Sequence, residues 1–364
     1  MIRTRKTELH SDIAIPPGEY LLEVLNEKSM SQAELANRMG RPPQAINEIV
    51  KGEKSITSET ALQLEQVLGV PAHIWTGLES EYQLVKAIQQ ESIQVQQEVT
   101  LLREIPYKEM AQLGWVKKIR DLKTRVRELR NFFGVASLNN VFKIRTYNPT
   151  FRCSTIDKAS PYALASWLHK GAIKAGRIQA IPFNKTKLIS VLPQIRSLSF
   201  ESPEEFTSKI QKILSDCGVA FVLLPHLTKT YANGATFWLS QDKSVLMMTI
   251  RGSYADIFWF SFFHELGHIL LHDKRLTFVD NDNKIEDKSK QEQEANKFAG
   301  EQLIPASNLN DFISKGDFSI SSIKAFAKNI CIPPWIIIGR LQHEGYLKFN
   351  QLNNLKVRYK WSDS

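Results

Sequence analysis

The chain has 364 residues, of which 43% are hydrophobic and 23% are charged, so it is too long for one ordinary core and too apolar to be disordered throughout. Its 47 Lys and Arg exceed its 38 Asp and Glu, and the net charge of +9 suits a polyanionic partner without bearing on the fold. The basic start at Arg3, Arg5 and Lys6 is followed by no apolar signal core, no apolar run reaches about 18 residues, and the three cysteines form no CxxC pair. We therefore expect a cytoplasmic protein of two or three domains, with no membrane segment and no disulfide framework.

Residues 17–78 carry the pattern of short helices separated by tight turns. Ser31 and Glu34 have the spacing of a capping box, in which the hydroxyl accepts from an early helix amide and the carboxylate reaches back to the Ser31 amide. Gly40 then supplies the C-terminal stop of this helix.

The next helix is expected to begin at the pair Pro42 and Pro43 and to end at Gly52, and a third helix is expected over residues 58–68. The inward-facing positions are Ile46, Ile49 and Val50 in the second helix and Ala61, Leu64, Val67 and Leu68 in the third. Residues 1–80 are therefore predicted to form an all-α domain built on a helix, a tight turn and a second helix.

The following segment, residues 81–150, is predicted to be a basic helical connector. Residues 1–80 hold eight Lys and Arg against eleven Asp and Glu, a net charge of −3, whereas residues 103–152 hold twelve against four. A basic helical run of this kind is usually a solvated helix face, and the alternative is a ridge that contacts phosphate groups. The sequence leaves both interpretations open.

Residues 151–364 are predicted to form a mainly helical α+β domain with a small sheet. The strand candidates are the short apolar runs at residues 219–224, 236–239 and 245–250. Residues 254–272 are then expected to form one long buried helix, and a second helix is expected over residues 292–303, ahead of Pro305.

An HExxH motif, His264-Glu265-Leu266-Gly267-His268, lies within the long buried helix. The spacing of four residues places His264 and His268 on one helix face, where both imidazoles can bind a single Zn²⁺. Glu265 lies beside them and is predicted to be the catalytic base that takes a proton from the attacking water. The alternative, two histidines satisfied in the core, would leave Glu265 as a buried carboxylate without a purpose.

A catalytic zinc site also needs a third protein ligand and one open position. The extended motif with a third histidine requires glycine where this chain has Leu271, so a downstream carboxylate is the better candidate. Glu292 is the preferred ligand, Glu294 is the reserve choice, and Asn296 shares the face of Glu292 and could orient a ligand. His272 is expected to be packed or to support a ligand rather than to bind metal.

These residues carry a resemblance that covers nearly the whole chain. Residues 16–78, with Ser31-Gln32-Ala33-Glu34-Leu35-Ala36 and residues 46–52, resemble the helix-turn-helix of HigA-type antitoxins in the XRE superfamily. Residues 236–305, with Phe258-Trp259-Phe260, the HExxH motif and residues 292–305, resemble the ImmA/IrrE family of metallopeptidases. The fusion is similar to a class of HigA-like regulators, whose tail resembles Ile338-Gly339-Arg340-Leu341-Gln342-His343.

The resemblance assigns roles residue by residue. The two histidine ligands of the peptidase family fall on His264 and His268, its catalytic glutamate on Glu265, and its ExxAN/D ligand on Glu292. The resemblance implies zinc, a zincin-like α+β domain, and proteolysis of a regulator or partner protein. A HigA-like domain implies toxin neutralisation and self-repression.

For DNA, the exposed positions of the predicted recognition helix include Gln44, Asn47 and Lys51. Gln and Asn side chains can make paired hydrogen bonds with adenine edges in the major groove, and Gln32 with Arg41 could hold phosphates. Because this domain is acidic, tight binding by one copy is not expected, and a homodimer on a two-fold operator is predicted. A helical protein-interaction module is the alternative.

The sequence thus favours a DNA-binding transcription regulator or antitoxin whose zinc-dependent HExxH endopeptidase domain cleaves a regulator or partner protein. The alternative is a non-proteolytic HigA-type antitoxin or autorepressor whose C-terminal domain only binds a toxin or ligand. The intact HExxH motif favours the enzyme, because a pure binding module needs no carboxylate that activates water. The expected partners are operator DNA, a protein substrate or cognate toxin, and a second copy of the chain.

Overall fold

The computed structural model describes residues 13–144, 160–252, 254–272, 278–279 and 289–361. The chain divides into two compact units, Met1–Val99 and Thr100–Ser364, which we call unit 1 and unit 2 and describe separately. The basic start at residues 3–6 and Cys153 lie outside the described residues. No described helix is both long enough and apolar enough to cross a membrane.

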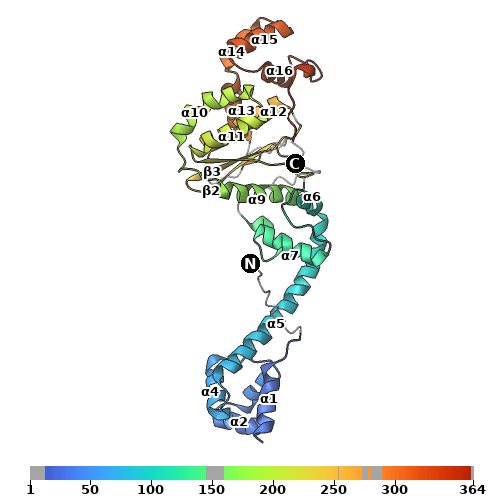
Figure 1. Cartoon of the computed structure of the whole chain (residues 1–364), viewed down its shortest axis with the longest axis vertical. Coiled ribbons are helices and arrows are strands. Elements are labelled where there is room, and N and C mark those ends of the chain that lie inside the picture. The colour runs from blue at the N-terminus through green and yellow to red at the C-terminus, as the bar shows by residue number, and fades with distance from the viewer. Residues whose placement is uncertain (1–12, 145–159, 253, 273–277, 280–288, 362–364) are drawn as a thin grey trace, which may run out of the picture. The chain divides into compact units, whose positions relative to one another are not determined.

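Unit 1 is all-α. Its helices are α1 (Pro17–Glu27), α2 (Gln32–Met39), α3 (Pro43–Val50), α4 (Ser58–Leu68) and α5 (Ala72–Glu98) (Figure 1). The predicted inward positions Ile46, Ile49, Ala61 and Leu64 are buried in one core with Leu21, Leu35 and Trp75. Gly18 lets α1 pack directly on the end of α3, because a Cβ at this position would lie 2.3 Å from the Val50 Cα.

The helix ends of unit 1 follow the predicted signals with one difference. Ser31 caps α2 by accepting a 3.1 Å hydrogen bond from the Glu34 amide, and Gly40 ends α2 with φ of 63°. The Glu34 carboxylate contacts Arg38, one turn further along α2. Only the Ser31 half of the predicted capping box is therefore formed, because the Glu34 carboxylate pairs with Arg38 instead of reaching back to the Ser31 amide.

The boundary between the units differs from the predicted one. The sequence places it after residue 80, but α5 runs through that position without a break and the units separate after Val99. Trp75, Tyr82 and Val85 are buried on α5, so its first half belongs to the unit 1 packing. The glutamine pairs at residues 89–90 and 96–97 do not interrupt α5, because glutamine is a good helix former.

Unit 2 has helices on both faces of a small sheet. Its elements are η1 (Val99–Arg103), which begins at the last residue of unit 1, α6 (Tyr107–Gln112), α7 (Leu122–Phe133), η2 (Leu138–Lys143), α9 (Pro161–Arg177), α10 (Lys185–Ser197), η4 (Leu198–Phe200), α11 (Pro203–Ser215), β1 (Val219–Leu223), β2 (Gly234–Ser240), β3 (Lys243–Met248), α12 (Ala255–Leu271), β4 (Phe278–Val279), α13 (Ser289–Leu303), α14 (Ala306–Ser314), α15 (Ile320–Asn329), α16 (Pro334–His343) and η5 (Asn353–Leu355). In Figure 1, α9 covers one face of the sheet and α10 to α13 cover the other.

The sheet has the strand order β1-β3-β2-β4, with β1 parallel to β3 and with β2 antiparallel to both β3 and β4. Its strands alternate between the two faces: Leu246 packs in the core with α11 and α12, whereas Met247 lies against α9, where Gly171 leaves room for its sulfur. The three predicted strands are observed, and the α+β prediction is confirmed. The strand β4 was not predicted.

The central helix of unit 2 is α12, which matches the predicted long buried helix. Most of its side chains are buried, including the fully buried Trp259, Phe262 and Phe263. The C-terminal segment supports its start: Trp259 donates a 3.0 Å hydrogen bond to the Tyr359 hydroxyl, and Lys356 lies 2.6 Å from Asp256. Helix α12 is thus held rigidly among the sheet, α13 and the C-terminal segment.

Candidate metal centre

Helix α12 brings the HExxH side chains together in a water-poor environment. His264 and His268 are 3% and 2% exposed, and Glu265 is fully buried. Aromatic residues of the preceding turns fill the surrounding space, so the ligand positions are fixed by packing. Burial of two histidines and a glutamate in adjacent turns is unusual for a structural helix, since each group loses hydration.

The structure brings the predicted third ligand to the same point. The Nε2 atoms of His264 and His268 lie 2.9 Å apart, and Glu292 Oε2 lies 3.1 Å from the first and 3.6 Å from the second. The three donor atoms lie within 4.8 Å of one another, which is close enough for one ion to contact all three. Helix α13 begins at Ser289, three residues before the predicted start, so Glu292 stands in its first turn.

Small residues allow α13 to approach the motif this closely. A Cβ on Gly267 would lie 3.2 Å from the Ala295 Cα and 3.1 Å from the Phe298 ring, so glycine suits this position. Ala295 and Ala299 are fully buried on the facing side of α13. Glu292 lies one turn before Ala295 on the same side of α13, and its carboxylate is therefore directed at the histidines.

Each of the two predicted ligand histidines is held through its Nδ1 atom. His264 Nδ1 lies 2.9 Å from Asn296 Oδ1, an acceptor, so this Nδ1 carries the proton and Nε2 presents a lone pair. Asn296 thus contacts the predicted ligand His264, and its role in orienting that ligand stays a prediction.

His268 is held by a chain of two hydrogen bonds, one with His272 and one from His272 to Glu294. His272 Nε2 lies 3.1 Å from the Glu294 carboxylate and must donate to it, so the His272 Nδ1 of a neutral ring is an acceptor. His268 Nδ1 lies 2.9 Å from that atom and therefore donates to it, which leaves the His268 Nε2 lone pair toward Glu292. Glu294, the reserve ligand of the sequence prediction, contacts His272 and takes no part in the three-donor cluster.

The protonation states of the cluster suit a cation. Burial lowers the pKa of His268 to about 4, against the opposing hydrogen bond with Glu292, so this imidazole is neutral near pH 7. Burial alone would raise the pKa of the Glu292 carboxyl, but hydrogen bonds with His264 and His268 outweigh it and lower that pKa to about 2. The cluster near neutral pH therefore offers a neutral imidazole at His268 and an ionised carboxylate at Glu292.

The predicted catalytic base lies against β2. The Thr236 hydroxyl contacts the Glu265 carboxylate and lies 3.3 Å from the Glu265 carbonyl oxygen. Gly234, at the start of β2, leaves room for the same side chain, since a Cβ there would lie 2.8 Å from Glu265 Oε1. Sequence analysis missed these roles of Thr236 and Gly234, because nothing local marks a strand residue as the partner of a helix residue 29 positions away.

In unit 1, the residues predicted to read DNA are exposed on α3 or at its end. Gln44 and Asn47 are both exposed, and the Gln44 amide donates a 2.8 Å hydrogen bond to Glu48 on the next turn. Lys51 is exposed directly after the last turn of α3. Gln44 and Asn47 lie on the solvent side of α3, opposite the buried Ile46, and Lys51 follows at the end of the helix.

The two residues predicted to contact phosphate, Gln32 and Arg41, differ in their surroundings. Gln32 is the first residue of α2 and is half-buried. The Arg41 guanidinium instead binds α4, with 2.6 Å to Gln63 and 3.1 Å to Glu59. Arg41 therefore ties the turn before α3 to α4, and a phosphate would have to compete with Glu59 for it.

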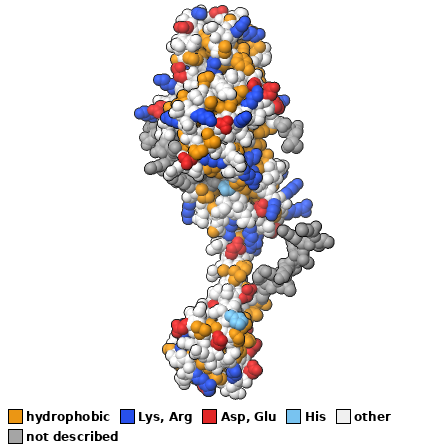
Figure 2. All heavy atoms as spheres, turned by 60° about the vertical axis from the view of Figure 1, so that its left-hand side comes forward, with side chains coloured by type: hydrophobic (Ala, Val, Ile, Leu, Met, Phe, Trp, Pro, Cys, Tyr) orange, Lys and Arg blue, Asp and Glu red, His pale blue; other side chains and the backbone are white. Residues whose placement is uncertain are grey.

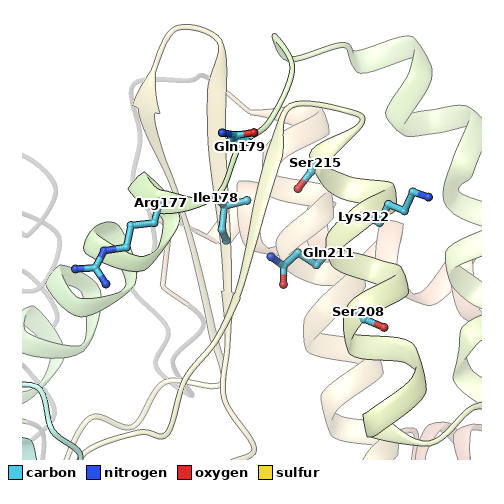
Figure 3. A pocket seen from close by; sticks show the side chains of 7 residues that line it. All are labelled: Arg177, Ile178, Gln179, Ser208, Gln211, Lys212 and Ser215. Carbon is cyan, nitrogen blue, oxygen red and sulfur yellow. The ribbon is translucent and has the colours of Figure 1, made fainter.

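A separate hollow of about 520 Å³ lies between the C-terminal end of α9 and α11 (Figure 3). It is lined by Arg177, Ile178, Gln179, Ser208, Gln211, Lys212 and Ser215. None of these residues belongs to the cluster of His264, His268 and Glu292. Arg177 points away from Lys212 in Figure 3. Because Arg177 and Lys212 do not point toward a common position, the hollow does not place two cations around one anion.

Fold and site together define a helix-turn-helix protein that also carries an HExxH domain with a His-His-Glu cluster. Residues 21–75 match the HTH_3 family, described as Helix-turn-helix, and residues 257–362 match the Peptidase_M78 family, described as IrrE N-terminal-like domain. The chain belongs to the helix-turn-helix family through its N-terminal part and has an IrrE-like peptidase-family domain at its C-terminal part. Both resemblances drawn from the sequence are confirmed.

Two curated relatives match the N-terminal part. Virulence-associated protein I of Dichelobacter nodosus is 39% identical over 77 residues, which is 21% of this chain and 71% of the relative. The uncharacterized HTH-type transcriptional regulator YddM of Escherichia coli K12 is 30% identical over 71 residues, which is 20% of this chain and 76% of the relative.

Solved structures similar to this chain also align with a small part of it. An addiction module antidote protein of the HigA family from Coxiella burnetii is 30% identical, with 23% of this chain and 94% of that chain covered and a TM-score of 0.22. The Pseudomonas aeruginosa antitoxin HigA, solved with the higBA promoter, is 32% identical, with 24% of this chain and 95% of that chain covered and a TM-score of 0.22.

We expect purified protein to bind zinc and His264→Ala to lose it, because a single carboxylate and one imidazole hold zinc weakly. Metal analysis after dialysis measures this, and His73→Ala, at an exposed histidine of unit 1, is the matched control. Circular dichroism checks that the variant is folded. Full zinc content in folded His264→Ala would show that the cluster is not the site.

Comparing substitutions of Glu292 and Glu294 distinguishes the predicted zinc ligand from a carboxylate that only hydrogen-bonds to His272. Glu292→Gln should abolish tight zinc binding because it removes a ligand, whereas Glu294→Gln should weaken zinc binding about 10- to 100-fold because it removes only the acceptor of His272. Competition with a zinc chelator measures both affinities. The reverse order of the two effects would make Glu294 the ligand.

Proposed function

We propose that this protein is a DNA-binding transcription regulator whose C-terminal domain is a zinc-dependent endopeptidase acting on a regulator or partner protein. The observation that carries the enzymatic part is the convergence of His264, His268 and Glu292 on one point, with the buried Glu265 in the same helix turn. The IrrE-like family match of residues 257–362 supports the same assignment.

The cluster fits a cation on chemical grounds. With Nδ1 protonated on both rings, the two Nε2 atoms and Glu292 Oε2 are three acceptors that face one another at 2.9 to 3.6 Å. Three acceptors at these distances are held together only by a positive charge, either a proton shared in the hydrogen bonds between the imidazoles and Glu292 or a metal ion bound by all three. Two imidazoles and one carboxylate are a zinc ligand set of catalytic type, which leaves a fourth position for water or substrate.

Glu265 would perform the proton transfers. A bound zinc ion would act as a Lewis acid that polarises a water and the scissile carbonyl. Glu265 then takes the proton of the attacking water and delivers it to the nitrogen of the departing amine, so that the peptide bond is hydrolysed with no net change at the enzyme. Thr236, which contacts the Glu265 carboxylate, keeps it at the helix turn next to the two histidines.

Part of β2 is available to align a substrate backbone. Residues 236–239, predicted from the sequence as a strand, could pair with a substrate strand, but β4 pairs with Ala235 and Thr236 on that edge. Among the described residues, the edge beyond Thr236 has no strand partner on that side. Pairing of substrate with β2 is therefore restricted to its second half, from Phe237 to Ser240.

The helix-turn-helix match and the exposed face of α3 support the DNA-binding part of the proposal. Gln44 and Asn47 lie on the solvent side of a helix whose opposite side is fixed in the core, which is the arrangement that presents side chains to a major groove. Two copies on a two-fold operator would double these contacts. Glu48 holds the Gln44 amide, so it orients a group that would face a base edge.

Glu265→Gln should retain zinc and fold but remove cleavage, because the amide cannot accept the proton of the water and Glu265 is not in the three-donor cluster. The comparison is made in cells that hold wild type, Glu265→Gln or the exposed control Glu204→Gln at equal abundance, with partner fragments detected by mass spectrometry. Identical regulation by all three, with no fragment of any protein, would replace the peptidase with the non-proteolytic antitoxin or repressor alternative.

Gln44→Ala and Asn47→Ala should each weaken operator binding by about 1 to 3 kcal/mol and leave binding to random duplex unchanged, because base contacts carry sequence information and phosphate contacts do not. Gln66→Ala, at an exposed glutamine of α4, is the control. Fluorescence anisotropy with both duplexes measures the difference. Equal losses on the two duplexes would place these side chains on phosphate, and binding of wild type to neither would favour a protein-interaction module.

A further inference from the structure

The basic segment between α6 and α7 presents its cations outward. Five exposed residues form what we call the α7 basic surface: Lys117, Lys118, Arg120, Lys123 and Arg127. Three of them lie in the loop before α7 and two lie one turn apart on the solvent side of α7, opposite the buried Val126, Leu129 and Phe133. Figure 2 shows Lys and Arg side chains gathered over the part of the molecule that carries α6 and α7.

The loop of this surface is fixed in place. The Tyr107 hydroxyl donates a 2.7 Å hydrogen bond to the Lys117 carbonyl, and Glu128 accepts a 2.9 Å hydrogen bond from the Lys117 amide. Arg125 donates a 2.8 Å hydrogen bond to the Ile119 carbonyl and lies over the Tyr107 ring. A merely solvated charge run needs no such anchoring, whereas a binding surface gains affinity when its backbone is already ordered.

The nearby carboxylates neutralise the surface only in part: hydrogen bonds with Thr124 lower the pKa of Asp121, and the charges of Lys123 and Arg127 lower it further. Asp121 caps α7 through a 2.7 Å hydrogen bond from the Thr124 amide, and Glu128 holds the loop. Within the described part of the chain, Lys118, Arg120 and Lys123 form no ion pair with a carboxylate. Residues 100–144 hold ten Lys and Arg against four Asp and Glu, a net charge of +6.

Unit 1, the unit proposed to read DNA, carries a net negative charge, whereas binding to a duplex is favoured by positive charge. Residues 1–99 hold nine Lys and Arg against fourteen Asp and Glu, a net charge of −5. Contacts between cations and phosphates supply most of the salt-dependent affinity of DNA-binding proteins. An acidic reading domain therefore needs cations from another part of the same chain, and the first described cluster after it is the α7 basic surface.

We propose that the α7 basic surface binds the phosphate backbone of double-stranded DNA and supplies affinity that unit 1 lacks, an inference that rests on the proposed DNA-binding function. The chemistry favours a duplex over a single strand. No aromatic side chain is exposed among the described residues 100–144, and recognition of single strands relies on stacking of bases on aromatic rings. Fixed cations on a helix and its preceding loop suit phosphates, which carry no sequence information.

The test uses the full chain and a duplex of the sequence upstream of its own gene. Affinity is measured between about 50 and about 200 mM salt for wild type, for the triple variant Lys118→Gln, Arg120→Gln and Lys123→Gln, and for a control. The control, Lys315→Gln, Lys324→Gln and Lys328→Gln, removes the same charge from exposed positions on and beside α14 and α15. Circular dichroism and zinc content confirm that each variant is folded.

We expect the slope of log affinity against log salt to become shallower by about 2.7 in the α7 variant, about 0.9 for each lost phosphate contact, and to stay unchanged in the control. Over the same salt range, wild type should lose about 40-fold more affinity than the α7 variant. Equal slopes for wild type and the α7 variant would overturn this inference and leave the DNA-reading role of unit 1 intact. Absence of wild-type binding would instead overturn the proposed DNA function together with it.

A second arm tests another anionic partner. Anionic phospholipid vesicles replace the duplex, and sedimentation measures binding of wild type and both triple variants. Vesicle binding that only the α7 variant loses, together with an unchanged DNA slope, would assign the surface to membranes and overturn the proposal. No difference between the two variants on vesicles, with the expected change on DNA, supports it.

Discussion

The close approach of α12 and α13 is the constraint on which the whole candidate site depends. The predicted ligands His268 and Glu292, 24 residues apart in the sequence, can meet only if the two helices touch along their length, and Gly267 against Ala295 is where they do. A side chain at Gly267 would move α13 away, and Glu292, one turn before Ala295, would move with it. The metal cluster is thus a consequence of backbone packing as much as of the HExxH motif.

This packing has an electrostatic cost that the surrounding polar groups offset. Burial of imidazoles and carboxylates is unfavourable unless each group finds a partner. Asn296 satisfies His264, the His272 and Glu294 pair satisfies His268, and Thr236 contacts Glu265. Because these partners also fix which nitrogen of each ring is protonated, the groups that make the cluster tolerable in the core are the same groups that direct its lone pairs toward one point.

The sequence could predict the features of the site that depend only on the spacing of residues along one helix. The i, i+4 spacing places His264 and His268 together on any helix, and the face that Glu292 shares with Asn296 follows in the same way from the period of α13. Contacts between distant segments were out of reach: the bond of Thr236 with Glu265 depends on how β2 packs on α12. Residues 81–150 were predicted to be helical, but the sequence did not show that one helix crosses the boundary placed after residue 80, since buried positions such as Tyr82 became visible only in the fold.

Tertiary context also changes what a charged residue is free to do. Arg41 fits a phosphate contact in a sequence pattern, yet Glu59 and Gln63 occupy its guanidinium in the fold. Among the described residues, Lys118, Arg120 and Lys123 of the α7 basic surface form no ion pair with a carboxylate. Under the two proposals, different segments would therefore contact different parts of the DNA. Helix α3 would recognise base edges, and the α7 basic surface would attract the DNA phosphates. Such a division has a physical consequence: changes in salt would alter residence on DNA through unit 2 while leaving the preference for one operator, set by unit 1, unchanged.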